Sequence, residues 1–199
     1  MKLLVIDNYD SFTFNLIELI RNCSPVEFEV FYNDKIEVIQ AANYDKILIS
    51  PGPGLPDKAG VSCEIIKKLA PVKNILGICL GHQAIATVFG GSLFNLNEVS
   101  HGKVGVMTVL DRNNPLFINI PDTFSAGLYH SWAVSKNHLP SCLIPIAESE
   151  TNTIMGIRHH AYNVYGLQFH PESVMTPLGK SILLNWLNSY NLKKKILIF

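Results

Sequence analysis

Residues 74–89 constrain the fold more than any other stretch of the chain. An apolar run ends at the segment 77–81 (GICLG), and a helical pattern of apolar residues begins immediately afterwards. We therefore expect a strand, a very tight turn and a helix, with Cys79 at the turn. The glycines two positions before and after Cys79 leave room for a sharp backbone turn that exposes the side chain between them. The N-terminus of the following helix would also stabilise a thiolate at this position.

Cys79 has two interpretations. A lone cysteine in an apolar strand is usually a small hydrophobic core residue. The two flanking glycines favour the other interpretation, in which Cys79 is a nucleophile held at the carboxyl end of a strand.

Apolar runs alternate with helical patterns in the first half of the chain. A helix capped by Asp10 or Ser11 is predicted to end by residues 24–25, and residues 34–37 (DKIE) resemble a capping box before a short helix. The resulting β-α-β-α-β-α-β order predicts an α/β fold with an open, mostly parallel, doubly wound sheet flanked by helices. Strands are predicted at 2–7, 27–32, 46–50 and before Cys79, and a further helix at about 58–69.

The pattern changes after Gly90 and Gly91. Short strands and turns with hairpin-like spacing predict a small additional antiparallel sheet. Thr176 and Pro177 are expected to open the last helix, with Thr176 as its N-cap. The strands of this region are predicted at 104–110, 123–134, 143–148, 153–158 and 163–169.

Length and composition set further limits. The 199 residues suit one domain spanning 1–199, and the equal numbers of basic and acidic residues (16 each) argue against nucleic acid or an anionic membrane as a partner. Neither a signal peptide nor a transmembrane run is visible. The four cysteines are widely spaced, so neither a zinc site nor a disulfide framework is indicated. We expect no metal, no cofactor and a cytoplasmic location.

A cysteine nucleophile needs a base, and His170 is the best placed of seven histidines. It ends an apolar strand and is followed by Pro171 and Glu172. Proline keeps the preceding residue extended, and in an extended chain residues two apart face the same side, so Glu172 can lie beside the His170 ring. The alternative is a capped strand end with a chance carboxylate.

The remaining histidines fit this role less well. His82 adjoins the turn, but we expect its side chain to point away from Cys79. His138, His159 and His160 lie in polar, turn-like stretches and are expected to be solvated.

Residues 50–54 (SPGPG) hold backbone N–H groups rigidly beside the strand that leads to Cys79. They can supply half of an oxyanion hole, although such a segment alone is more often a rigid turn. The segment matches neither a dinucleotide nor a P-loop motif.

Four separate segments together resemble the class I (triad) glutamine amidotransferases: 7–15 (DNYDSFTFN), 50–54, 77–83 (GICLGHQ) and 168–173 (QFHPES). Within this family the chain is similar to the glutaminase subunit, component II, of anthranilate synthase or aminodeoxychorismate (para-aminobenzoate) synthase. The segments 101–103 (HGK) and 129–131 (YHS) match that branch, although no role for the first follows from its residues. The resemblance extends to about Leu187, and the tail 191–199 lies beyond the usual end of the family.

The resemblance implies a catalytic triad of Cys79, His170 and Glu172. Cys79 would attack the side-chain amide of glutamine, His170 would pass the thiol proton to departing ammonia, and water would hydrolyse the thioester. From the residues alone, Gln83 is equally well a solvated helix position. The implied oxyanion donors are the N–H groups of Leu80 and Gly52, and the implied glutamine contacts are Gly52, Pro53, Gly54, Gln83 and the main chain of Ser131 and Trp132.

The resemblance also implies a protein partner, a chorismate-binding synthase component I that uses the ammonia. The sequence leaves open whether the partner makes anthranilate or 4-amino-4-deoxychorismate. Two further hypotheses remain: a stand-alone Cys-His hydrolase of γ-glutamyl compounds, and a non-catalytic binding module.

Overall fold

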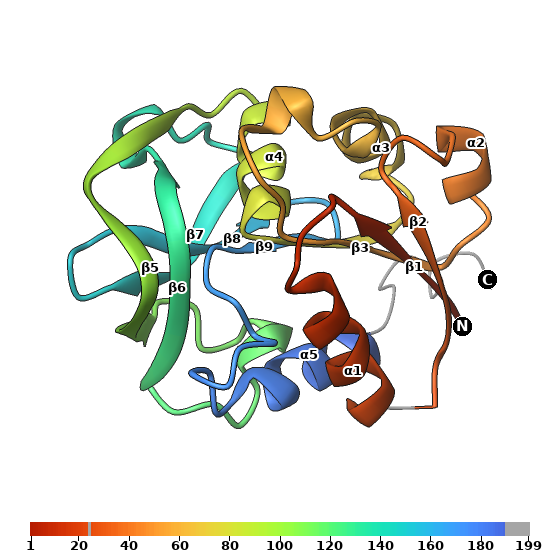
Figure 1. The fold of residues 1–199 in the computed structure, drawn as a ribbon. Helices are drawn as coiled ribbons and strands as arrows, with labels where there is room; N and C mark the ends of the chain where they lie inside the picture. The colour runs from red at the N-terminus through yellow and green to blue at the C-terminus, as the bar shows by residue number, and fades with distance from the viewer. Residues whose placement is uncertain (24, 190–199) are drawn as a thin grey trace, which may run out of the picture.

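A computed structural model describes residues 1–23 and 25–189, so the prediction for the tail 191–199 lies outside the described residues. The strands form one mixed sheet in the order β2-β1-β3-β4-β9-β8-β7-β5-β6 (Figure 1). The strands are β1 (Lys2–Asp7), β2 (Glu27–Tyr32), β3 (Lys46–Ile49), β4 (Asn74–Ile78), β5 (Leu93–Val109), β6 (Thr123–Val134), β7 (Leu143–Ser149), β8 (Ile154–His159) and β9 (Val164–Leu167). The α-helices are α1 (Thr13–Cys23), α2 (Val38–Ala41), α3 (Ser62–Leu69), α4 (Leu80–Val88) and α5 (Gly179–Asn188), and 3-10 turns occupy Pro56–Lys58, Pro115–Phe117 and Lys136–His138.

The parallel half of the sheet confirms the predicted doubly wound architecture. β2, β1, β3, β4 and β9 pair in parallel, and every residue of β3 and β4 is buried. In Figure 1, α1 and α5 cover one face of this half, and α3 and α4 cover the other. Strands buried on both faces read as continuous apolar runs, which is why they were visible in the sequence.

Each face of the sheet has its own apolar core. Leu16 and Ile20 of α1 pack with Trp186 of α5 in one core, whereas Ile65 of α3 packs with Ile85 of α4 in the other. The sheet thus supports helices on both sides, and the carboxyl ends of its parallel strands lie at one edge.

The antiparallel half differs from the prediction. β8, β7, β5 and β6 pair antiparallel, as expected, but they continue the main sheet instead of forming a separate one. β5 is 17 residues long and shifts register against β6 between Asn95 and Ser100. The sequence predicted only its last part, 104–110, because the polar residues before it lack a strand-like alternation.

Three local predictions are resolved by hydrogen bonds. Asp10 shapes the turn that leads into α1, where its side chain accepts from the N–H of Phe12 at 2.8 Å, but among the described residues no side-chain cap bond from Asp10 to the helix itself is seen. The capping interaction before α2 lies at Glu37, whose N–H donates to the side chain of Gln40, so the box predicted at 34–37 is wrong. The helix predicted at 58–69 begins later, at Ser62, after a 3-10 turn.

The prediction that Thr176 caps the last helix is also wrong. α5 begins at Gly179, and Thr176 instead joins two distant segments. Its hydroxyl donates to the carbonyl of His170 at 2.6 Å and accepts from the N–H of Gly127 at 2.9 Å. Thr176 therefore fixes the backbone of His170 against β6.

Within the described part of the chain, no helix has the length and apolar character needed to cross a membrane.

Candidate active site

The turn at Cys79 has the tight geometry that the sequence predicted. Cys79 has φ 50° and ψ −99° at the N-cap of α4, and its N–H donates to the carbonyl of Leu167 at 2.8 Å. A positive φ on a non-glycine residue costs about 1–3 kcal/mol and is typically found at functional sites. The strain is held by the strand on one side and the helix on the other.

The two flanking glycines are required by close packing. A Cβ atom at position 77 would lie 2.3 Å from the carbonyl carbon of Gly81, and one at position 81 would lie 2.6 Å from the carbonyl oxygen of Ile49. No real Cβ approaches backbone atoms so closely, so larger residues would displace the turn that carries Cys79.

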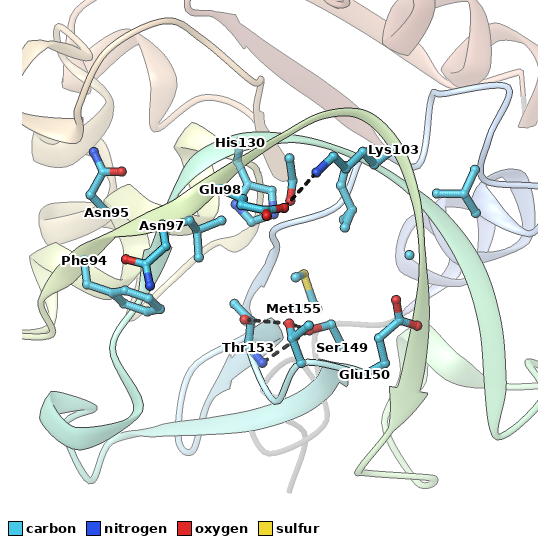
Figure 2. A pocket seen from close by; sticks show the side chains of 16 residues that line it. Phe94, Asn95, Asn97, Glu98, Lys103, His130, Ser149, Glu150, Thr153 and Met155 are labelled. Carbon is cyan, nitrogen blue, oxygen red and sulfur yellow. Dashed lines mark hydrogen bonds and ion pairs between the residues drawn. The ribbon is translucent and has the colours of Figure 1, made fainter.

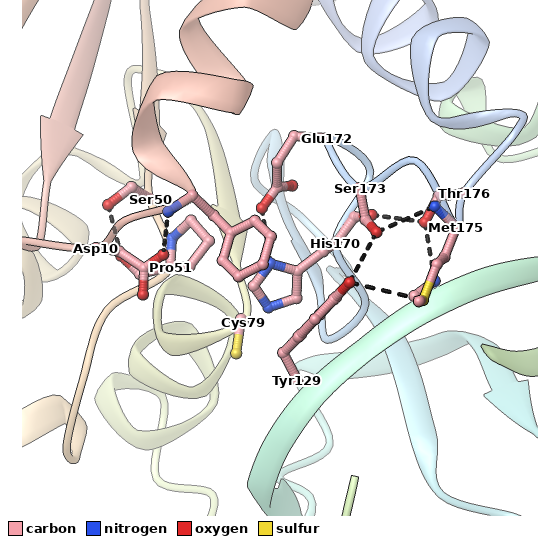
Figure 3. Close-up of polar contacts among 12 residues, drawn as sticks. Asp10, Ser50, Pro51, Cys79, Tyr129, His170, Glu172, Ser173, Met175 and Thr176 are labelled. Carbon is pink, nitrogen blue, oxygen red and sulfur yellow. Dashed lines mark hydrogen bonds and ion pairs between the residues drawn. The ribbon is translucent and has the colours of Figure 1, made fainter. Parts of the chain in front are cut away.

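His170 and Glu172 form a buried pair, as predicted from their spacing. Nδ1 of His170 lies 2.7 Å from Oε1 of Glu172, and both residues are buried. In Figure 3 the imidazole lies between Glu172 and Cys79, with its other nitrogen toward the sulfur. That nitrogen, Nε2, is buried and has no hydrogen bond of ordinary geometry among the described residues. The sulfur and the imidazole, 91 positions apart in the sequence, thus meet at one edge of the sheet.

The charge of His170 follows from its neighbours. Burial lowers the pKa of His170, but the interactions with Cys79 and Glu172 outweigh burial and raise it to about 10. The imidazolium is therefore the stable form at neutral pH beside these two groups.

Aromatic rings enclose the His170 imidazole. The ring centroid of Tyr129 lies 5.0 Å from it and that of Phe12 lies 5.4 Å from it. The hydroxyl of Tyr129 in turn lies 3.2 Å from that of Ser173 (Figure 3). These contacts exclude water from one side of the imidazole and limit its rotation.

The proline-glycine segment lies beside the Cys79 turn. A Cβ at Gly52 would lie 2.5 Å from Cβ of Asn8 and 2.6 Å from a side-chain carbon of Leu80, so Gly52 touches the first residue of α4. Asn8 fixes this segment: its N–H donates to Oγ of Ser50 and its side-chain amide donates to the carbonyl of Ser50. The two implied oxyanion donors, Gly52 and Leu80, are therefore neighbours.

Pro53 and Gly54 line a cavity of about 550 Å³ together with Leu80. Gln83 does not line this cavity and is buried, so the solvated alternative is wrong. Its side-chain amide donates to the carbonyl of Trp132 at 3.0 Å. The structure thus brings the side chain of Gln83 to the main chain of Trp132.

Gln168 is the site residue that the sequence reasoning missed. It is fully buried, and its side-chain nitrogen lies 3.5 Å from Sγ of Cys79. The alternation that paired His170 with Glu172 could have found it, because Gln168 precedes His170 by two positions.

The other histidines are distributed differently from the prediction. His138 and His160 are exposed as expected. His159 is buried and stacked on Tyr162, with 4.2 Å between ring centroids, so the expectation that it is solvated is wrong. His82 is fully buried and packs against Gly166 of β9.

The cavity beside β5 is larger than the one at Gly54 but lies apart from the triad residues. It measures about 590 Å³ and is bounded by β5 and the turn after β7, with Lys103 and Glu98 paired at its edge (Figure 2). His130 belongs to its lining and hydrogen-bonds through Nδ1 to the carbonyl of Trp132. Neither Cys79 nor His170 lines it, so this cavity does not contain the reactive groups of the candidate site.

Among the described residues, no cluster of three or more His, Cys, Asp or Glu side chains is arranged to hold a metal ion.

The fold and the Cys-His-Glu arrangement define a class of protein. The model of the family "Glutamine amidotransferase class-I" matches residues 4–189, and the chain belongs to this family of enzymes. A solved structure from Thermoplasma acidophilum, provisionally described as one of the subunits of GMP synthase, superposes with a TM-score of 0.82 at 26% identity, covering 94% of this chain and 92% of that one.

Curated relatives point to one branch of the family. The chain is 44% identical over 187 residues to a provisionally named anthranilate synthase component II of Haemophilus influenzae, covering 94% of this chain and 96% of that protein. It is 43% identical to anthranilate synthase component 2 of Saccharolobus solfataricus (93% and 97% covered). It is 41% identical to the aminodeoxychorismate/anthranilate synthase component 2 of Bacillus subtilis (94% and 96% covered). The predicted resemblance is thus confirmed for the family and for this branch.

Proposed function

We propose that the protein is a glutaminase subunit that hydrolyses glutamine through a thioester on Cys79 and delivers ammonia to a chorismate-aminating partner. The observation that carries this proposal is the strained Cys79 turn lying beside the buried His170–Glu172 pair. The relatives named component II support the assignment to anthranilate or 4-amino-4-deoxychorismate synthesis.

In the proposed mechanism the Cys79 thiolate attacks the side-chain carbonyl carbon of glutamine, forming a C–S bond. His170 carries the proton from the thiol and gives it to the amide nitrogen as the C–N bond breaks, so ammonia leaves. Water then attacks the thioester, glutamate departs and Cys79 is restored. Glu172 orients the imidazole and stabilises its charged form.

The N–H groups of Leu80 and Gly52 are the proposed oxyanion donors. Their adjacency at the start of α4 supports this assignment, and such donors typically contribute about 10²–10³-fold each to catalysis. Pro53, Gly54, Gln83 and the main chain of Ser131 and Trp132 are the proposed glutamine contacts.

A partner is expected because free ammonia would protonate and diffuse away in water. Two large apolar side chains near the carboxyl edge of the sheet, Phe14 and Val174, are 75% and 94% exposed, which supports a docking partner there. His101 of the HGK segment packs edge-on against Tyr129 at 5.4 Å, so we assign this segment to the partner-facing surface as well. We also propose a cytoplasmic location, because a free thiol at Cys79 suits a reducing compartment. The proposal treats residues 1–199 as a single domain.

The proposal is tested by Cys79→Ser in the complex with a chorismate-using subunit. We expect loss of glutamine-dependent product, while synthesis from added ammonium salt continues at the wild-type rate. Equal loss of both activities would make the cysteine structural and contradict the proposal. Full glutaminase turnover without any partner would instead favour a stand-alone hydrolase.

A further inference from the structure

Gln168 occupies a position that the proposed mechanism does not use. Its side chain is fully buried and lies between the nucleophile and Gln83. Its main-chain N–H donates to the carbonyl of Met155 at 2.9 Å, which anchors the residue just beyond β9. Because Gln168 and His170 are two positions apart in extended chain, both side chains reach the Cys79 side of the sheet.

Hydrogen bonding determines which end of the Gln168 amide faces the sulfur. The carbonyl of Trp132 can only accept, so the Gln83 atom 3.0 Å from it is the NH₂ group. The same NH₂ lies 3.2 Å from the Gln168 amide and must meet its oxygen. The remaining end of Gln168, its NH₂, is therefore the atom 3.5 Å from Sγ of Cys79.

We propose that Gln168 is a further catalytic residue, which stabilises the thiolate of Cys79 by donating a hydrogen bond to its sulfur. A thiolate is a much better acceptor than a thiol, so a buried donor held at this distance favours the charged form. His170 faces the same sulfur with its other ring nitrogen (Figure 3), so the sulfur lies near the imidazole as well as the Gln168 donor.

Gln83 acts as the positioning residue for this donor. Both hydrogens of its side-chain NH₂ are used, one by Trp132 and one by Gln168. Since Gln83 is also a proposed glutamine contact, substrate bound there would act on the group that holds the Gln168 amide. This inference rests on the proposed role of Cys79 as nucleophile.

The test is the pH profile of Cys79 alkylation by iodoacetamide in the absence of glutamine, followed on the Cys79 peptide by mass spectrometry. Gln168→Met replaces the amide with an apolar chain of similar length, and Gln168→Asn retracts the donor by one methylene. We expect both variants to move the midpoint of the profile upward by about one to two pH units, which slows alkylation about 10- to 100-fold below the midpoint. Gln83→Met should move it in the same direction by less.

Gln40→Met is the matched control, because it makes the same change at an exposed glutamine of α2. Its profile should coincide with that of the wild type. If Gln168→Met does not fold, Gln168→Asn carries the test, because it keeps a polar amide in the buried site. Midpoints in the folded Gln168 variants equal to that of Gln40→Met would overturn the proposal. That result would leave the Cys79→Ser assay unaffected, so the two proposals fail separately.

Discussion

His82 follows Cys79 in the chain on α4, whereas His170 lies in the region after β9, and the surroundings of these two buried histidines shift their pKa values in opposite directions. His82, on α4, is fully buried against Gly166, and burial lowers its pKa to about 3, helped by the nearby His130. Burial also acts on His170, but Cys79 and Glu172 reverse its effect and raise the pKa to about 10. A buried imidazole thus becomes a proton carrier only where a carboxylate and a thiol accompany it.

Of the substitutions that test this contrast between the two histidines, His170→Ala is expected to cause the largest loss of activity. Removing the imidazole takes away the group that transfers the proton, and general acid-base groups contribute about 10²–10⁴-fold. We expect glutamine-dependent glutamate release by the complex to fall by this factor, with ammonium-dependent synthesis retained. A loss of glutamate release below tenfold would show that His170, like His82, serves the structure and does not transfer the proton.

A smaller effect is expected from Glu172→Gln. The amide can still accept from Nδ1 of His170, but the charge that favours the imidazolium is lost. A hydrogen bond to a charged group contributes about 1.5–3 kcal/mol, so we expect glutaminase kcat to fall about 10- to 100-fold with little change in KM. Equal rates for the variant and the wild type would remove Glu172 from the mechanism.

His82→Asn tests whether burial keeps His82 neutral, through the pH dependence of the free energy of unfolding. The unfolded chain protonates His82 below about pH 6.5, whereas the folded chain keeps it neutral until about pH 3. The unfolded state therefore binds more protons in this window, and the free energy of unfolding falls with decreasing pH by about 1.4 kcal/mol per unit from this group. Between pH 7 and pH 5 the wild type should lose about 2 kcal/mol more than His82→Asn in urea unfolding. Equal losses would contradict the assigned neutral state of His82.

The smallest effect is expected at the cavity beside β5. The side chain of Glu150 accepts from the N–H of Val106 at 3.0 Å and lies apart from the triad. Because surface substitutions typically change stability by about 0.5 kcal/mol or less, Glu150→Gln should change both stability and glutaminase rate very little. A tenfold loss of glutaminase activity would bring this cavity into the chemistry.

The sequence predicted those parts of the molecule that are specified by residues close together in the chain. Continuous apolar runs marked the parallel strands, and the glycines around Cys79 marked a turn that leaves no room for side chains. The His170–Glu172 contact followed from proline geometry and the two-residue period of extended chain.

The remaining features depend on contacts between distant segments. Thr176 resembled a helix cap, but it bonds to Gly127, 49 positions away. His159 resembled a solvated turn residue, but it stacks on Tyr162 and lies 4.6 Å from the ring of Phe89. Gly127 and Phe89 lie outside any local window of sequence around Thr176 and His159, whereas Tyr162 lies close to His159 in the chain but gives no sign there of the stacking.

The most direct test of the account is covalent trapping of Cys79 by a glutamine analogue that carries a diazoketone in place of the amide. Once the diazo carbon takes up a proton, the thiolate displaces N₂ from that carbon and forms a stable thioether, and peptide mass spectrometry locates the adduct. We predict that the folded protein, in complex with its synthase partner, is labelled at Cys79 and not at Cys23, Cys63 or Cys142, and that glutamine protects it. Labelling confined to those three cysteines, or no labelling of the folded complex, would contradict the central claim that Cys79 is the nucleophile.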